Sequence, residues 1–146
     1  MTTIAYKDGV LVANSRSYAG SKMPLGRKSK IHRLADGSLF GCSSSKVGQP
    51  EKFRRLVEEF GVEHTFEKEV LAQAIVIKPN GDVFYFNDED AFSGPIETDC
   101  LAIGSGEEYA IGAMLHGATA QEAIVIAAEC DVWTGGELET LILNDN

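Results

Sequence analysis

Thr3-Ile4-Ala5-Tyr6, Asp8-Gly9 and Val10-Leu11-Val12-Ala13 follow one another in this 146-residue chain. An Asp-Gly pair between two apolar runs strongly indicates a β-hairpin, because the residues of its tight turn take positive φ. The pattern recurs at Asp36-Gly37, between expected strands at 30–34 and 38–42. It recurs again at Asn80-Gly81, between expected strands at 70–78 and 83–86. Three such turns predict a fold rich in antiparallel strands.

Three segments have the spacing of helices. Phe53, Leu56, Val57 and Phe60 stand at i, i+3, i+4 and i+7, which places them on one face of a helix over 50–60. A second helix is expected over 107–116. A third is expected over 119–129, where Thr119-Ala120-Gln121-Glu122 forms a capping box.

Short strands are expected at 100–103 and 138–143, and loops at 14–29 and 87–99. Strand-rich blocks alternate with helices in this order, which predicts an α+β layer fold.

Composition narrows the function further. The length predicts a single domain, 1–146. The formal net charge of −9 argues against non-specific nucleic-acid binding, although residues 22–33 are locally basic. The longest apolar run, 123–128, is too short to cross a bilayer, and no targeting segment is seen. Three cysteines without metal-ligand spacing indicate free thiols in a reducing compartment. We therefore expect a cytoplasmic protein without a metal or cofactor; the cysteines are Cys42, Cys100 and Cys130.

Several segments together resemble the proteasome β-type subunits and the bacterial peptidase HslV. They are 2–7, 9–16 and 19–20, then Leu101-Ala102-Ile103-Gly104-Ser105-Gly106 with Tyr109-Ala110, then 117–124, and finally Asp131-Val132-Trp133-Thr134-Gly135-Gly136. The resemblance covers nearly the whole chain, with gaps, and rests on the order and spacing of these pieces. It implies the four-layer αββα sandwich of N-terminal-nucleophile hydrolases.

The resemblance also implies an activity and partners. Family members are threonine peptidases that assemble into rings and hydrolyse unfolded polypeptides, which an ATP-driven AAA+ unfoldase supplies. This chain is shorter than the family pattern. Only 50–60 is clearly helical before Val70, so a second helix is missing or reduced to a turn. We expect the sheet face beneath that helix to be exposed and to recruit a second copy of the chain.

The site residues follow from the resemblance, position by position. Thr2 matches the nucleophile. After removal of Met1 its α-amine, with an ordinary pKa of about 7.7–8.0, can take the proton of its own hydroxyl. Lys30 matches the active-site lysine, whose charge lowers the pKa of that amine and stabilises developing negative charge. Ser105 matches the serine beside the nucleophile. Asp131 and Thr134 match the D-x-x-[ST]-G-G element that orients the site.

Two positions depart from the family pattern. Asn14 stands where the family has the aspartate that pairs with the lysine, and an alignment of Ser15 with that position stays open. Exchanging Asn14 for Asp is expected to hold Lys30 protonated and to raise activity. Ser44 matches the position whose backbone N–H is the oxyanion donor, but it carries a side chain where the family usually has glycine. While Met1 stays attached, Thr2 has no free amine.

Two other functions therefore stay open. The first is a catalytically silent homologue that acts in assembly or regulates a partner peptidase. The second is an amidase that uses Thr2 on a small substrate. A Cys42 nucleophile with His32 and a cation site at Asp88-Glu89-Asp90 are weaker alternatives. A buried thiol and a solvated acidic loop explain them better.

Overall fold

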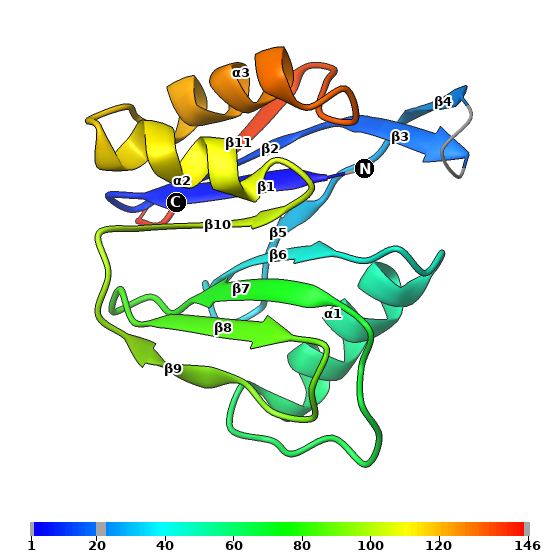
Figure 1. The fold of residues 1–146 in the computed structure, drawn as a ribbon. Helices are drawn as coiled ribbons and strands as arrows, with labels where there is room; N and C mark the ends of the chain where they lie inside the picture. The colour runs from blue at the N-terminus through cyan, green and yellow to red at the C-terminus, as the bar shows by residue number, and fades with distance from the viewer. Residues whose placement is uncertain (1, 20–22, 145–146) are drawn as a thin grey trace.

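A computed structural model describes residues 2–19 and 23–144 of the chain. Figure 1 shows its elements. Within the described ranges, the strands and helices are β1 (Thr3–Lys7), β2 (Val10–Asn14), β3 (Arg16–Ala19), β4 (Met23–Arg27), β5 (Ile31–Arg33), β6 (Leu39–Ser43), α1 (Gln49–Phe60), β7 (Gln73–Ile77), β8 (Val83–Asn87), β9 (Ser93–Ile96), β10 (Cys100–Gly104), α2 (Glu107–Leu115), α3 (Ala120–Cys130) and β11 (Leu138–Ile142).

These elements stack in four layers, helix–sheet–sheet–helix (Figure 1). One sheet has the strand order β10-β1-β2-β11, and α2 and α3 cover its outer face. The other has the order β5-β6-β7-β8-β9, and α1 covers its outer face. All neighbouring strands in both sheets are antiparallel. The predicted α+β sandwich of four layers is confirmed.

The alternation along β1 shows why the layers form. Successive side chains of a strand point to opposite faces. Ile4 and Tyr6 therefore enter the core between the two sheets, whereas Ala5 faces the core under α2 and α3. The third core lies between the second sheet and α1, where Phe53 is fully buried against Phe86 with ring centroids 4.6 Å apart.

The three predicted turns join strands of these two sheets. Asp8-Gly9 links β1 to β2 in one sheet, while Asp36-Gly37 and Asn80-Gly81 link strands of the other. The helices at 50–60, 107–116 and 119–129 are confirmed to within one residue, and the Thr119–Glu122 capping box is present.

The second helix of the family pattern is absent, since no helix occurs over 61–72. The expected exposed sheet face is nevertheless wrong. Phe66 and Val70, at 6% exposure each, fold onto the core beneath α1 and cover it. Backbone hydrogen bonds from Phe66 to Asp90 and from Val70 to Glu89 fix this segment.

Two predicted loops contain strands instead. Residues 14–29 include the hairpin of β3 and β4, and 87–99 include β9. Every residue of β4 is exposed, so it has no buried face that would alternate apolar with polar residues. No helix in the described part of the chain is long and apolar enough to span a membrane.

Candidate active site

Thr2 directly precedes β1, and its carbonyl is held by the turn after β10. Ser105 N–H donates to Thr2 O over 2.8 Å. In the antiparallel pairing of β1 with β10, Thr3 lies opposite Gly104. A Cβ at Gly104 would lie 1.8 Å from Thr2 O, and its φ of +100° also favours glycine. The Gly-Ser-Gly sequence thus lets the backbone approach the candidate nucleophile this closely.

Ser105 and Asp131 meet beside Thr2 although they lie 26 positions apart. Ser105 Oγ donates to Asp131 Oδ2 over 2.6 Å, and Thr134 Oγ1 donates to the same oxygen over 2.6 Å. Trp133 N–H donates to Asp131 Oδ1 over 3.2 Å. Burial raises the pKa of Asp131, but these three hydrogen bonds outweigh it, so the net pKa is lowered. The carboxylate is therefore a stable acceptor at the centre of the site.

Thr3 extends this network through a hydrogen bond to Thr134, and the neighbouring contacts show which hydroxyl donates. Thr3 Oγ1 lies 2.7 Å from Thr134 Oγ1 and accepts the N–H of Gly106 over 2.9 Å. The Thr134 hydroxyl has one proton, which goes to Asp131. The Thr3 hydroxyl therefore donates to Thr134. Sequence reasoning missed this residue because a threonine beside the matched nucleophile carries no distinguishing pattern.

Asn14 connects Thr3 to the loop after α3. Its Oδ1 accepts the Thr3 N–H over 2.8 Å, and its Nδ2 donates to Gly135 O over 3.2 Å. A side-chain amide supplies both an acceptor and a donor, whereas an ionised aspartate only accepts. Asn14, not Ser15, contacts β1. The buried Ser15 Oγ makes no hydrogen bond to a described residue.

Lys30 is buried, with 6% exposure, and its Nζ donates to Arg16 O over 2.7 Å. Burial first, and then the charges of Lys28 and Arg16, lower the pKa of Lys30 to about 8. Arg16 N–H also donates to Gly135 O over 3.0 Å. The lysine is therefore tied through Arg16 to the same loop that Asn14 holds. Arg16 is a second residue that the sequence prediction omitted.

Ser44 directs its side chain away from this cluster. Its hydroxyl donates to Leu71 O over 2.5 Å and accepts the Lys46 N–H over 3.0 Å. The backbone N–H of Ser44 donates to no described residue. The role of this N–H as the oxyanion donor stays a prediction.

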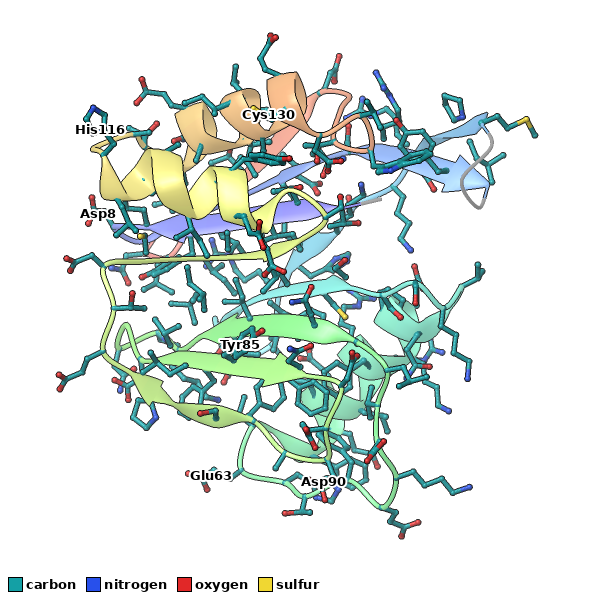
Figure 2. The ribbon with its side chains drawn as sticks, in the orientation of Figure 1. Asp8, Glu63, Tyr85, Asp90, His116 and Cys130 are labelled. Carbon is teal, nitrogen blue, oxygen red and sulfur yellow. The ribbon has the colours of Figure 1, made fainter. Side chains whose placement is uncertain are left out.

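The weaker alternatives gain nothing from the structure. Burial is the main cause that raises the pKa of Cys42 to about 12, so its thiol stays protonated. Cys42, Cys100 and Cys130 are free, but only the first two are buried; Cys130 lies exposed at the end of α3 (Figure 2). No group of three or more His, Cys, Asp or Glu side chains suited to a metal occurs among residues 2–19 and 23–144.

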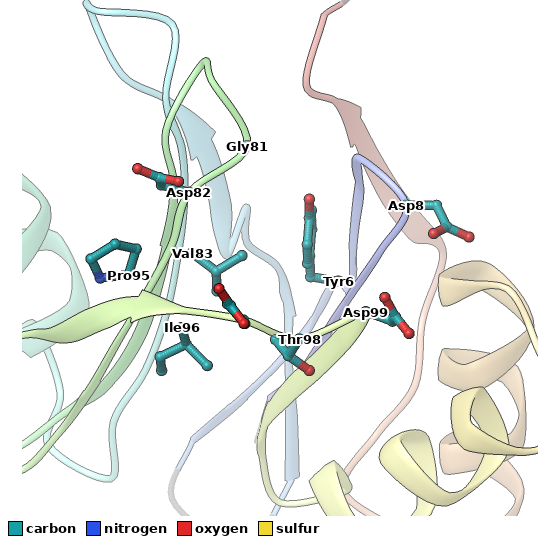
Figure 3. Close-up of a pocket in the computed structure, with 10 residues that line it drawn as sticks. Tyr6, Asp8, Gly81, Asp82, Val83, Pro95, Ile96, Thr98 and Asp99 are labelled. Carbon is teal, nitrogen blue, oxygen red and sulfur yellow. The ribbon is translucent and has the colours of Figure 1, made fainter.

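Two of the surface hollows lie at opposite ends of the sandwich. The one beside Lys30 has about 260 Å³ and is also lined by His32, Cys42, Glu51 and Arg54. The other has about 400 Å³ and lies beside Tyr6 and Asp8 (Figure 3). Its lining includes the half-buried Asp82 and the exposed Asp8, Glu97 and Asp99 around Tyr6.

All of the predicted site residues except Ser44 thus belong to one network. Hydrogen bonds join Thr2, Ser105, Asp131 and Thr134 directly. Asn14 joins them through Thr3, and Lys30 through Arg16 and Gly135. Among the described residues, Ser44 makes no hydrogen bond to this network. Met1, whose removal the mechanism needs, lies outside the described residues, as does part of the basic stretch 22–33.

Comparison with solved structures identifies the architecture. HslV of Trypanosoma brucei matches with a TM-score of 0.72 and 19% identity, over 99% of this chain and 100% of that one. Thiobacillus denitrificans BPH matches with a TM-score of 0.65 and 16% identity, over 99% of both chains. The same protein in complex with epoxomicin matches with a TM-score of 0.68 and 17% identity, over 99% of both chains. No protein-family model matches, and neither does any curated protein. This chain therefore has the HslV/proteasome β-type fold.

Proposed function

We propose that the chain is a threonine-type peptidase subunit that cleaves unfolded polypeptides through Thr2 after Met1 is removed. The observation that carries the proposal is the hydrogen-bonded junction of Ser105 with both Thr2 O and Asp131. It fixes the residue that the resemblance assigns as nucleophile. The matched structures add support at the level of the fold, and one of them holds epoxomicin.

Thr2 supplies both the nucleophile and the base of the proposed reaction. Its α-amine takes the proton from Oγ1 as the oxygen attacks the scissile carbonyl, and the resulting oxyanion accepts the free Ser44 N–H. The peptide C–N bond breaks, the leaving amine takes the proton from the Thr2 ammonium, and an acyl ester on Oγ1 remains. Water, deprotonated by the same amine, attacks the ester; the bond to Oγ1 then breaks, Oγ1 takes the proton from the Thr2 ammonium, and the acid is released. The charge of Lys30 favours both oxyanions while it is protonated.

Assembly with copies of itself is part of the proposal. Residues 16–55 hold ten basic and two acidic residues, a formal net charge of +8, against −17 for the rest of the chain. The acidic hollow at the far end makes no ion pair with the described residues. Opposite charges on one chain favour contacts between unlike surfaces of two copies. Light scattering at low and high salt tests this, and a monomer at every salt concentration would contradict it.

The proposal also includes a partner and a compartment. No glycine-rich phosphate loop stands out in the sequence, and an ATP-driven unfoldase would supply the unfolded substrate. The free cysteines are consistent with a reducing cytoplasm.

One observation favours a second function, a silent homologue that binds or regulates a partner peptidase. Asn14 supplies an uncharged amide to Thr3 and Gly135 at the position where the family pattern has a carboxylate.

One experiment separates the two. A fusion cut directly before Thr2 exposes its amine, and intact mass then shows whether epoxomicin adds to the protein. The uncut fusion and Thr2→Ala are the matched controls. Addition to the cut wild type alone supports the peptidase, and no addition to any form supports the silent homologue.

A further inference from the structure

Gln73 joins the two sheets at the edge of the candidate site. It begins β7 of the five-stranded sheet, where it pairs with Ser43 and Asn87. Its side chain nevertheless reaches the other sheet. Gln73 Oε1 accepts the N–H of Gly104, the last residue of β10, over 3.1 Å. Its Nε2 lies 3.4 and 3.5 Å from the two carboxylate oxygens of Glu107, the first residue of α2.

The turn between these two contacts holds Thr2 and Thr3. Ser105 N–H donates to Thr2 O over 2.8 Å, and Gly106 N–H donates to Thr3 Oγ1 over 2.9 Å. Gln73 therefore contacts the residues on both sides of the turn, Gly104 before it and Glu107 after it. A shift of the turn would rotate the peptide plane of Thr2, since the carbonyl of Thr2 is bound there.

We propose that Gln73 is a positioning residue, which orients Thr2 by fixing the turn at Ser105. The effect on catalysis rests on the proposed function, because it takes Thr2 as the nucleophile. The effect on the turn does not. Catalysis is sensitive to such placement, since a misplacement of about 1 Å can cost about a hundredfold in rate.

The amide of Gln73 suits both contacts, because it accepts at Oε1 and donates at Nε2. Leucine would offer neither. Glutamate would accept from Gly104 but would face the like charge of Glu107. In the double variant Gln73→Glu/Glu107→Gln, the carboxylate at position 73 still accepts the Gly104 N–H, and the amide at position 107 now donates to it, so both contacts are retained.

The test uses the protein with Thr2 exposed and two readouts. The first is amide hydrogen exchange at Gly104 and Ser105, measured by NMR. The second is epoxomicin labelling, resolved into a maximal rate and a half-saturating concentration. Gln73→Leu is expected to accelerate exchange and to lower the maximal rate about tenfold, with the half-saturating concentration unchanged. The exchanged pair is expected to restore both readouts, whereas Gln73→Glu alone is not. Gln121→Leu on α3 is the matched control and leaves both unchanged.

The outcomes separate this inference from the proposed function. The inference is overturned if Gln73→Leu shows the same hydrogen exchange and the same labelling as the wild type. It is also overturned if the double variant Gln73→Glu/Glu107→Gln restores neither readout. If the wild type does not label at all, the proposed function fails and exchange alone decides. Faster hydrogen exchange at Gly104 in Gln73→Leu, reversed in the double variant, would still support the conclusion that Gln73 fixes the turn. Unchanged exchange would overturn it.

Discussion

The Ser105 hydroxyl donates a 2.6 Å hydrogen bond to the Asp131 carboxylate. This contact joins the turn after β10 to the loop after α3, and the same Ser105 binds Thr2 O through its backbone. One residue thus connects the start of β1 to the carboxylate that organises the site. A substitution of either Ser105 or Asp131 is therefore expected to change the position of Thr2.

Asp131→Asn should destabilise the fold at neutral pH. Three donors face this carboxylate. The side-chain NH2 of an asparagine cannot accept a hydrogen bond, so at least one of these buried donors would lose its acceptor, at a cost of about 1–3 kcal/mol. The lowered pKa of Asp131 means that its stabilisation is present above the unfolded pKa of about 3.9 and is lost as pH falls through the folded value. Urea unfolding of both proteins from pH 7 to pH 3 measures this. The difference should shrink only in acid, and the exposed control Asp99→Asn should show none. A difference that is constant with pH would contradict the assignment.

Lys30 should impose an alkaline limit on labelling of Thr2. Labelling rises as the α-amine of Thr2 loses its proton and falls as Lys30 loses its charge near pH 8. The pH–rate profile of epoxomicin labelling should therefore have a narrow optimum. Lys30→Arg should lose the falling limb, because arginine stays protonated. Lys30→Met should slow labelling by about a hundredfold or more. A wild-type rate that still rises at pH 10 would show that Lys30 does not act on the nucleophile.

Gly104 and Gly112 make a matched pair. Gly104→Ala places a Cβ 1.8 Å from Thr2 O at a φ of +100°, so it should destabilise the protein by about 2 kcal/mol or more. Gly112 lies exposed in α2, and a Cβ there would meet nothing within 4 Å, so Gly112→Ala should stabilise by about 0.5–1 kcal/mol. Thermal unfolding of the two variants measures both effects. Equal shifts in Tm would contradict the close approach at Thr2.

Asn14→Asp should lower stability, and this effect is separate from the gain in activity that the sequence leads us to expect. The second carboxylate oxygen would face Gly135 O, where Nδ2 now donates over 3.2 Å. Gly135 O would keep the N–H of Arg16 as its donor, so we expect the loss of the Asn14 bond to cost about 1 kcal/mol. Urea unfolding tests the stability, and labelling tests the activity. Faster labelling would support the expectation from sequence, and unchanged stability would contradict the loss predicted from the Gly135 contact.

The sequence predicted the elements whose apolar patterns are distinct, and it missed those without one. The turn at Asp8-Gly9, the helix around Phe53 and the capping box at Thr119 each carry a local chemical pattern. β4 and β9 do not, because their residues are mostly exposed and pair only at the edges.

The candidate site divides in the same way. Ser105, Asp131 and Thr134 could be placed because their motif resembles a family. Gln73 contacts Gly104 N–H and the Glu107 carboxylate, and the backbone of Arg16 accepts from Lys30 and donates to Gly135; all of these partners except Lys30 lie far along the chain. No local pattern predicts such a bond, and only the packing of the two sheets brings these residues to the site.

The most direct test of the central claim is the intact mass of the protein with Thr2 exposed, after incubation with epoxomicin. The proposed function predicts addition of one probe mass to the wild type. It predicts no addition to Thr2→Ala or to the form in which Thr2 stays blocked. A folded wild type that remains unmodified under the same conditions would contradict the peptidase and leave the silent homologue in its place.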